Sequence, residues 1–408
     1  MKNFIKVLVI LLLIFVIFLL SSCPINPDDD SNKNENDNNK TSNSLVEFLT
    51  LLQTTAVSGG SYIYELKVDE VITPQNLSYI GKENITITLR GDNTNRTISL
   101  STNGAMFTVR SGVTLVLDNN LTLQGRVSNN NALVVVAADA MLIMNHGVII
   151  TGNTNTSSRG GGVVLSLALT ALGQNEGGKF IMNGGEIINN RALGAGGGVA
   201  ISSTAAFTMK NGKISGNSTV TSLLTTTGNG GGVLAYGNFV MEGGEISGNS
   251  VSSSSASGAN GGGVYVEQTD FTMKGGKIFG NTATSSGSTS NASGGGVYVA
   301  GTTGFPATFK MEGGEIFGNT VTASLLSRGG GVRISNGSSQ SESNSFFIKT
   351  GGIITGFTDD SINENVVRIN DSTIRNNYGH AVFFTNTRRK ESTIGITENL
   401  DSSIPTGW

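Results

Sequence analysis

The chain contains few cysteines, prolines and charged residues. Among its 408 residues there are one cysteine, one tryptophan and five prolines, and only 13% are charged, against about 25% in ordinary domains. One cysteine excludes an internal disulfide, and scarce proline without a glycine at every third position excludes collagen. A net charge of −3 offers no basic field, so we expect no nucleic-acid partner.

The single cysteine, Cys23, follows a short hydrophobic segment. Lys2 and Lys6 precede an apolar run over residues 7–20, which is short for a spanning helix and typical of an export signal. The sequence LSSC at residues 20–23 resembles the lipobox of bacterial lipoproteins. The resemblance implies a signal peptide over residues 1–22, lipidation of Cys23 and stable anchoring by several acyl chains. An uncleaved N-terminal anchor is the alternative.

Residues 23–43 are rich in Asn, Asp and Lys and nearly free of aliphatic side chains. Such a segment buries too little surface to fold, so it is predicted to be a flexible tether. Asp28, Asp29 and Asp30 are a weak calcium hypothesis, because they lack the glycine turn and later glutamate of an EF-hand loop.

Residues 44–60 contain the one convincing helix of the mature chain. Ser44 and Glu47 form a capping box, and the apolar residues recur with helical spacing: Leu45, Phe48, Leu49 and Leu52. A short amphipathic helix ahead of a long β region is predicted to cap the first coil, which would otherwise expose an unpaired edge.

An internal repeat dominates the rest of the sequence. A GGGV motif recurs at residues 160–163, 196–199, 230–233, 261–264, 294–297 and 329–332, and a second block follows each of the first five. Typical copies of that block are FVMEGGEISGN from Phe239 and FTMKGGKIFGN from Phe271, with an earlier copy from Leu142 and a worn one from Phe346. Such periodicity indicates a stacked structural unit.

Each repeat contains three short alternating runs separated by glycines, which supply the conformations that corners need. Three strands without an intervening helix predict an all-β fold, a right-handed parallel β-helix with about one coil per repeat. Propeller blades need longer repeats. We expect irregular coils over residues 61–139, regular repeats over 140–357, and degenerate coils with a C-terminal cap over 358–408.

Stacking turns each block position into a column of like residues. Three columns are predicted to fill the core, represented by Met241, Ile246 and the phenylalanines, and an asparagine ladder is predicted at a corner whose left-handed backbone asparagine tolerates. The aromatic column is Phe180, Phe207, Phe239, Phe271, Phe309 and Phe346, and the amide column is Asn190, Asn217, Asn249, Asn281 and Asn319.

Two further columns alternate in charge from one coil to the next. They are Lys210, Glu242, Lys274 and Glu312, and Glu186, Lys213, Glu245, Lys277 and Glu315. Opposite charges at strand spacing attract, whereas a slip by one coil sets like on like. The alternation is therefore predicted to fix the register.

The pairing of an IxGN element (residues 278–281) with a GGGV motif (294–297) resembles the FxxN and GGAI repeats of polymorphic outer-membrane proteins. The resemblance covers about residues 142–356, with Ile for Phe and Val for Ile. It implies a surface protein that adheres to other cells, but no particular ligand. The lipobox is expected to replace that family's C-terminal membrane domain as the anchor.

Enzymatic residues are sparse in the repeats. Glu267 and Asp270 are the best available acid pair and a weak candidate for a polysaccharide lyase or glycoside hydrolase, which needs two carboxylates across a cleft. The two histidines, His146 and His380, belong to coils that are far apart. His380 near Asp371 is a weaker candidate for part of a Ser-His-acid set. No cluster predicts a metal, so we expect no enzyme, metal or cofactor.

Segments rich in Ser and Thr follow each closing asparagine, for example residues 218–229, 250–260 and 282–293. They are predicted to be variable loops, either spacers or a contact surface. Tyr265 and Tyr298 are predicted to stack outward and to contact a host or cell-surface protein or glycan. The expected function is a non-enzymatic adhesive scaffold, anchored through Cys23 and exposed on the outer membrane. The alternatives are a carbohydrate-active enzyme and a structural periplasmic protein.

Overall fold

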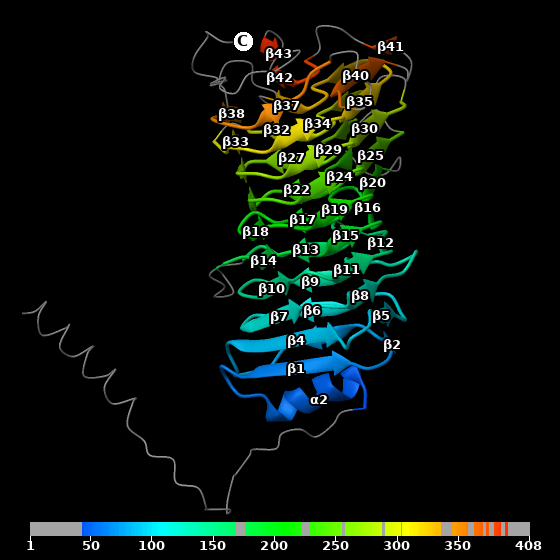
Figure 1. The fold of residues 1–408 in the computed structure, drawn as a ribbon, viewed down its shortest axis with the longest axis vertical. Helices are drawn as coiled ribbons and strands as arrows, with labels where there is room; N and C mark the ends of the chain where they lie inside the picture. The colour runs from blue at the N-terminus through cyan, green and yellow to red at the C-terminus, as the bar shows by residue number, and fades with distance from the viewer. Residues whose placement is uncertain are drawn as a thin grey trace, which may run out of the picture. The chain divides into compact units, whose positions relative to one another are not determined.

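A computed structural model describes residues 43–157, 159–168, 176–221, 228–254, 258–287, 290–302, 304–335, 345–357, 363–369, 373–374, 379–384 and 388–390. Within these residues the chain winds into stacked coils, and α2 (Leu45–Thr55) covers the first coil (Figure 1). Five sheets, here named A to E, run along the stack, and their strands pair in parallel from coil to coil except near the C-terminal end. The fold is a right-handed parallel β-helix.

Sheets A and B contain ten strands each. Sheet A consists of β1 (Ser61–Leu66), β4 (Ile85–Gly91), β7 (Val113–Leu117), β10 (Met141–Met144), β14 (Lys179–Met182), β18 (Ala206–Met209), β23 (Asn238–Met241), β28 (Asp270–Met273), β33 (Ala307–Met311) and β38 (Ser345–Lys349). Sheet B consists of β2 (Glu70–Ile72), β5 (Arg96–Leu100), β8 (Leu121–Gln124), β11 (Val148–Thr151), β15 (Glu186–Ile188), β19 (Lys213–Ser215), β24 (Glu245–Ser247), β29 (Lys277–Phe279), β34 (Glu315–Phe317) and β39 (Ile353–Ile354).

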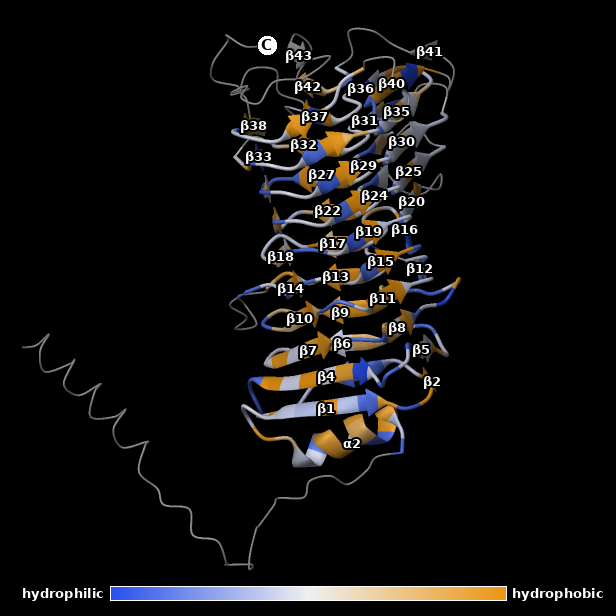
Figure 2. Ribbon diagram, viewed as in Figure 1, coloured by the Kyte–Doolittle hydropathy of each residue, from blue (hydrophilic) through white to orange (hydrophobic). Residues whose placement is uncertain are grey.

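Sheet C follows the glycine motifs and closes each coil. It consists of β3 (Gln75–Leu77), β6 (Phe107–Val109), β9 (Val134–Val136), β13 (Val163–Leu165), β17 (Val199–Ile201), β22 (Val233–Ala235), β27 (Val264–Glu267), β32 (Val297–Ala300), β37 (Val332–Ser335), β42 (Val382–Phe384) and β43 (Arg388–Lys390). Hydrophobic residues, orange in Figure 2, are concentrated in strands such as β9, β11 and β13.

Sheets D and E correct the prediction of three strands per repeat. Sheet D consists of β12 (Thr154–Asn155), β16 (Arg191–Leu193), β20 (Ser218–Thr221), β25 (Ser250–Ser253), β30 (Thr282–Ser285), β35 (Thr320–Ala323), β40 (Val366–Ile369) and β41 (Thr373–Ile374), and sheet E of β21 (Gly228–Asn229), β26 (Ala259–Asn260), β31 (Asn291–Ser293) and β36 (Leu326–Arg328). A full coil therefore runs A, B, D, E, C, whereas the fully described early coils, before residue 154, lack D and E.

The Ser/Thr-rich segments are thus largely strands, and the prediction that they are loops was wrong for their ends. Val251, Ala283 and Val321 of sheet D pack with Ala259 and Ala292 of sheet E in a second buried cluster. Small apolar residues between the Ser and Thr residues supply this cluster. Residues 222–227, 255–257 and 288–289, at the middle of these segments, lie outside the described residues.

The predicted core columns are confirmed, with one change of register. The phenylalanine rings from Phe180 to Phe309 are buried and stack with centroids 4.6–5.0 Å apart. The column then continues to Phe347, whose ring lies 5.2 Å from that of Phe309, and not to Phe346, which pairs with Thr308. Because the worn block begins one residue later than predicted, Lys349 takes the place of methionine and is buried beside Met311.

The predicted asparagine ladder is present and buried. Asn249 Nδ2 donates to Asn281 Oδ1 (3.0 Å) and to the carbonyl oxygen of Ile214 (2.9 Å), and Asn249 Oδ1 accepts from the backbone and side chain of Asn217. The ladder continues to Asn153 at one end and Asn365 at the other. Since every buried polar atom of the Asn249 side chain is paired, the column adds stability at each corner.

The ladder residues do not adopt the left-handed backbone that was predicted for them. The preceding residue does so instead, with φ between 56° and 64° at Asn189, Gly216, Gly248, Gly280 and Gly318. The asparagines serve as hydrogen-bonding partners between coils, and the residue before each makes the turn.

The helix caps the stack as predicted. Ser44 Oγ accepts the backbone N–H of Glu47 (3.3 Å), and Glu47 Oε2 accepts that of Asn43 (3.0 Å). Leu45, Leu49 and Leu52 are buried in the same core as the coils. The helix thereby covers the end of the hydrophobic column.

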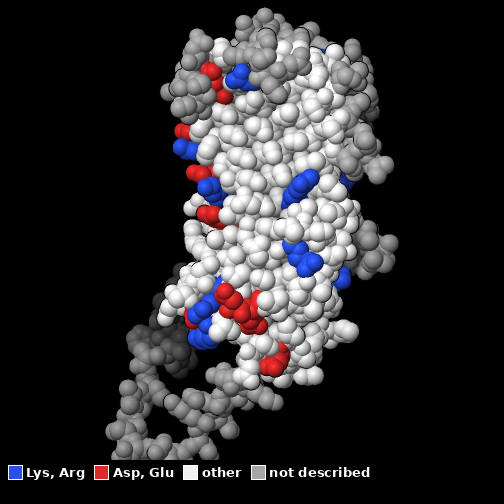
Figure 3. All heavy atoms as spheres, turned by 90° about the vertical axis from the view of Figure 1, so that its right-hand side faces the viewer, with Lys and Arg blue, Asp and Glu red and all other residues white. Residues whose placement is uncertain are grey.

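The charge columns are partly closed into ion pairs. In sheet B the register places Glu245 beside Lys277 and Lys277 beside Glu315, and acidic and basic side chains alternate along one edge of the stack (Figure 3). Lys277 Nζ lies 3.4 Å from Glu315 Oε2, and Lys274 Nζ lies 3.2 Å from Glu242 Oε1. Glu312 departs from the prediction because it pairs with Lys310 of its own coil at 2.6 Å.

The last described coils keep one element of the repeat and lose another. Gly379 has φ 69° and Val382 pairs with Val332, so GHAV takes the GGGV place. Ile374 does not continue sheet B; it pairs antiparallel with Arg368 of sheet D.

Candidate functional site

The GGGV corners bring two columns of side chains face to face. At each corner the first glycine has a left-handed backbone, for example φ 67° at Gly261. The second approaches the next coil so closely that a Cβ on Gly262 would lie 2.4 Å from the carbonyl oxygen of Gly295. This tight turn folds sheet E back toward sheet C. The residue before each GGG and the residue after each valine therefore lie across a cleft, which we call the corner cleft.

The two columns change composition along the stack. On the sheet E side they run Asn229, Asn260, Ser293 and Arg328, and on the sheet C side Leu234, Tyr265, Tyr298 and Arg333. The N-terminal part of the cleft is filled, because Ala195, Ala200, Leu234 and Tyr265 form a buried cluster. The C-terminal part holds the larger polar and charged side chains.

The tyrosine pair was predicted correctly as a stack and wrongly as an exposed one. The rings of Tyr265 and Tyr298 are nearly parallel, with centroids 5.1 Å apart. Tyr265 is only 6% exposed, because it packs with Ala195, Ala200 and Leu234 in a buried cluster. Its hydroxyl donates to Glu267 Oε2 (3.0 Å), and burial, then Tyr298 and Glu267, raise the pKa of Tyr265. Tyr298 is half-buried and is the member of the pair that can meet a ligand.

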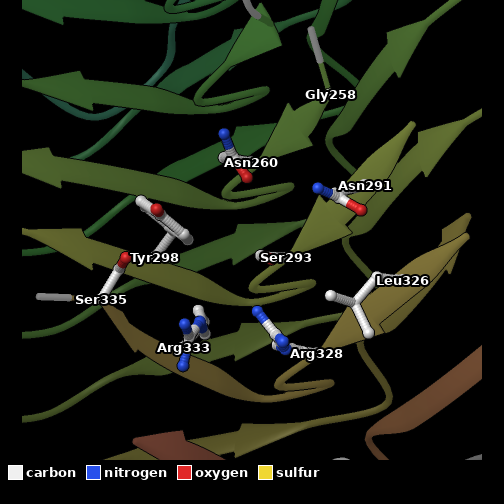
Figure 4. A pocket seen from close by; sticks show the side chains of 9 residues that line it. All are labelled: Gly258, Asn260, Asn291, Ser293, Tyr298, Leu326, Arg328, Arg333 and Ser335. Carbon is white, nitrogen blue, oxygen red and sulfur yellow. The ribbon is translucent and has the colours of Figure 1, made fainter. Parts of the chain in front are cut away.

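A cavity of about 220 Å³ opens beside Tyr298. Sheet E and its approach contribute Gly258, Asn260, Asn291, Ser293, Leu326 and Arg328, and sheet C contributes Tyr298, Arg333 and Ser335. In Figure 4 the guanidinium groups of Arg328 and Arg333 lie together on one side, with Asn260 and Asn291 across from them. Among the described lining residues two are basic and none is acidic.

The two arginines converge on one aromatic ring. The guanidinium carbons of Arg333 and Arg328 lie 4.6 Å and 5.4 Å from the centre of the buried Phe383 ring. Arg333 is 7% exposed, and its Nη1 has no hydrogen-bond partner among the described residues. Burial lowers the pKa of Arg333; Tyr298 opposes that effect and Arg328 adds to it. Each guanidinium remains charged at neutral pH, so the cavity wall is positive.

The predicted acid pair does not form part of this cavity. Glu267 ends β27 in sheet C and accepts the Tyr265 hydroxyl, whereas Asp270 begins β28 in sheet A and is exposed. The two carboxylates thus belong to different sheets on either side of a turn. Neither carboxylate lines the described cavity beside Tyr298.

His380 does not line this cavity. His380 is buried, accepts the backbone N–H of Val367 at Nδ1 (3.2 Å) and packs on Phe357. Its predicted partner Asp371 lies outside the described residues, as do Cys23 and Asp28, Asp29 and Asp30. In the described ranges no group of three or more His, Cys, Asp or Glu side chains could hold a metal ion.

Sequence reasoning missed two features of the surface. The arginines occur in the sequence as RGGGVR at residues 328–333, so the signal was the pair of positions flanking each GGGV. A second aromatic pair, Phe279 and Phe317, stacks half-buried on the outer face of sheet B with centroids 5.0 Å apart. The alternation Lys277-Ile278-Phe279 already placed this phenylalanine on the outside.

Comparisons with known proteins return no matching family model, no curated protein and no solved structure. Within the described part of the chain, no helix is both long enough and apolar enough to cross a membrane.

Proposed function

We propose that this chain is a lipid-anchored surface protein whose β-helix is a rigid, non-enzymatic scaffold for binding a host or neighbouring-cell partner. The observation that carries the proposal is the contrast between the repeated columns and the corner cleft. Phe, Met, Ile and Asn recur in the core of successive coils, whereas the cleft changes from Leu234 to Tyr298 to Arg333. A repeated core with a varied outer surface suits a binding scaffold.

The resemblance of LSSC at residues 20–23 to a lipobox supports the anchor, and the polar tether that follows supports display away from the membrane. The cleft supports binding over catalysis, because its described cavity is lined by cationic, amide, hydroxyl and aromatic groups without a carboxylate. The alternative is a structural protein of the periplasm, and exposure of the chain on the cell surface would exclude it.

Protease treatment of intact cells tests the proposal. We expect residues 44–408 to be degraded on intact cells, while a control protein enclosed by the envelope survives. When cells are grown with radiolabelled palmitate, the wild-type protein should incorporate the label and the Cys23→Ser variant should not. If residues 44–408 resist protease until the envelope is breached, display is excluded. If the wild-type protein takes up no labelled palmitate, the lipid anchor is excluded.

A further inference from the structure

The cavity in the corner cleft is built for an anion. Arg328 and Arg333 come from different sheets, yet both lie against Phe383. Bringing two like charges together while removing water from one of them is unfavourable. Arg328 has a further interaction, so the cost falls on Arg333, beside which the described cavity lining contains no acidic residue. The nearest carboxylate in the same sheet column, Glu267, stands two strands from Ser335 and accepts the Tyr265 hydroxyl.

Arg333 shows where the anion would bind. The side chain is more than nine-tenths buried, and its Nη1 has no hydrogen-bond partner among the described residues. Nη1 is itself closed to solvent, and a buried donor without a partner is rare and destabilising. A guanidinium presents a planar fork that matches a carboxylate with two parallel hydrogen bonds. A carboxylate bound in the cavity would balance the buried charge of Arg333 and reduce its repulsion with Arg328.

The rest of the lining indicates what carries the carboxylate. Asn260, Asn291, Ser293 and Ser335 offer amide and hydroxyl groups, Tyr298 offers an aromatic ring, and Leu326 is the one aliphatic side chain of the described lining. Neutral donors and acceptors around an aromatic ring suit the hydroxyls and the face of a sugar, whereas a peptide side chain needs a more apolar lining. The volume of about 220 Å³ is below the roughly 300–1,000 Å³ of sites for larger ligands, so it suits one ring.

We propose that the corner cleft binds a sugar unit that bears a carboxylate, with Arg333 and Arg328 holding the carboxylate and Tyr298 and the amides holding the ring. This inference deepens the proposed function, on which it rests for its biological setting, by naming the chemical class of the ligand. The binding itself needs neither lipidation nor display, so the two proposals fail separately.

The test is calorimetric titration of the full-length protein in detergent micelles. Methyl glucuronide should bind, whereas methyl glucoside, which lacks the carboxylate, and acetate, which lacks the ring, should bind at least tenfold more weakly. Added salt should weaken the interaction with glucuronide. If methyl glucoside binds as tightly as methyl glucuronide, the arginines do not hold a carboxylate. If acetate binds as tightly as methyl glucuronide, the sugar ring is not recognised. Tighter binding of a Glu-rich peptide would overturn the choice of ligand class.

Variants locate the site. Arg333→Gln should reduce glucuronide affinity at least tenfold, and Arg333→Lys should recover only part of it, because lysine keeps the charge without the fork. Arg191→Gln, at an exposed arginine of sheet D, is the matched control and should bind normally. Tyr298→Leu should weaken the binding of methyl glucuronide more than it weakens the binding of acetate. Thermal unfolding checks that each variant is folded, and unchanged affinity in a folded Arg333→Gln protein would overturn the proposal.

Discussion

At the scale of single residues, the three glycines of each corner have different physical roles. Gly261 is required both for its left-handed backbone and for space, since a Cβ there would lie 2.4 Å from the carbonyl oxygen of Val264. Gly262 and Gly263 are required for space alone, since a Cβ on either would lie within 3 Å of a carbonyl oxygen in the next coil. Gly280 has φ 63° but open space around it, because the nearest atom of another coil lies 3.8 Å from where a Cβ would stand. The same residue type therefore carries different constraints at neighbouring corners.

This difference predicts unequal costs for two alanine substitutions. Gly280→Ala places an L-residue in a left-handed conformation and should lower the free energy of unfolding by about 1–2 kcal/mol. Gly262→Ala sets a methyl group 2.4 Å from Gly295 O and 2.6 Å from Thr282 O, both backbone atoms, and should cost about 3 kcal/mol or more. Urea unfolding of the two variants measures the difference, and equal losses would show that the coils can separate to admit a methyl group.

The residue scale also shows how far sequence reasoning could go. The asparagine and phenylalanine columns followed from the fixed spacing inside each block, because stacking converts equal positions into neighbours. The prediction of Phe346 overlooks the glycine pair of the worn block. Gly351 and Gly352 stand four and five residues after Phe347, which is the spacing that the regular blocks keep after their phenylalanine. The sequence therefore favours Phe347, in agreement with its pairing in β38. The burial of Tyr265 depends on packing with Ala195, Ala200 and Leu234 of other coils, which no pattern within one repeat encodes.

At the scale of elements, sheets D and E explain why the cleft was not predicted. Their strands are two to four residues long and read as polar loops, apart from small residues such as Val251 and Ala283. They form strands because equivalent residues in successive coils pair, and the cluster of Val251, Ala259, Ala283 and Ala292 holds the two sheets together. Sheets A, B and C contain alternating large residues, so their existence could be predicted.

The charged columns give a prediction at this scale. Replacing Lys274 and Lys277 by Glu removes contacts with Glu242 and Glu315 and sets like charges beside each other in both columns. These side chains are 38–51% exposed, and exposed pairs are worth about 0–1 kcal/mol each. We therefore expect a loss of about 1–3 kcal/mol in the free energy of unfolding, which shrinks in high salt.

The matched control is Lys274→Gln with Lys277→Gln, which removes attraction without adding repulsion. It should cost less than the Glu variant and should respond less to salt. Equal stability of the two variants in low-salt urea unfolding would mean that the alternation does not influence pairing between coils.

At the scale of the whole molecule, the described coils form one continuous stack with one main core. The helix at the first coil and the interrupted parallel pairing at the last described coils limit the exposed ends, as solenoids require. The fold class was predictable because the period, the glycines and the absence of helical spacing all agreed. The binding partner was not, since the cavity arises from residues that depart from the repeat.

The sign alternation has a consequence for how such a chain can change length. The charge pattern repeats every two coils, so removing an odd number of coils and removing an even number have different effects. A gene that loses one repeat places Lys210 over Lys274 and Lys213 over Lys277, whereas loss of two repeats restores Lys beside Glu. Deleting residues 239–270 should give a protein that salt stabilises, and deleting residues 239–308 should give one that salt does not stabilise. Unequal recombination would then favour the gain or loss of an even number of repeats. The same salt response in both deletion variants would show that the number of repeats is not constrained in this way.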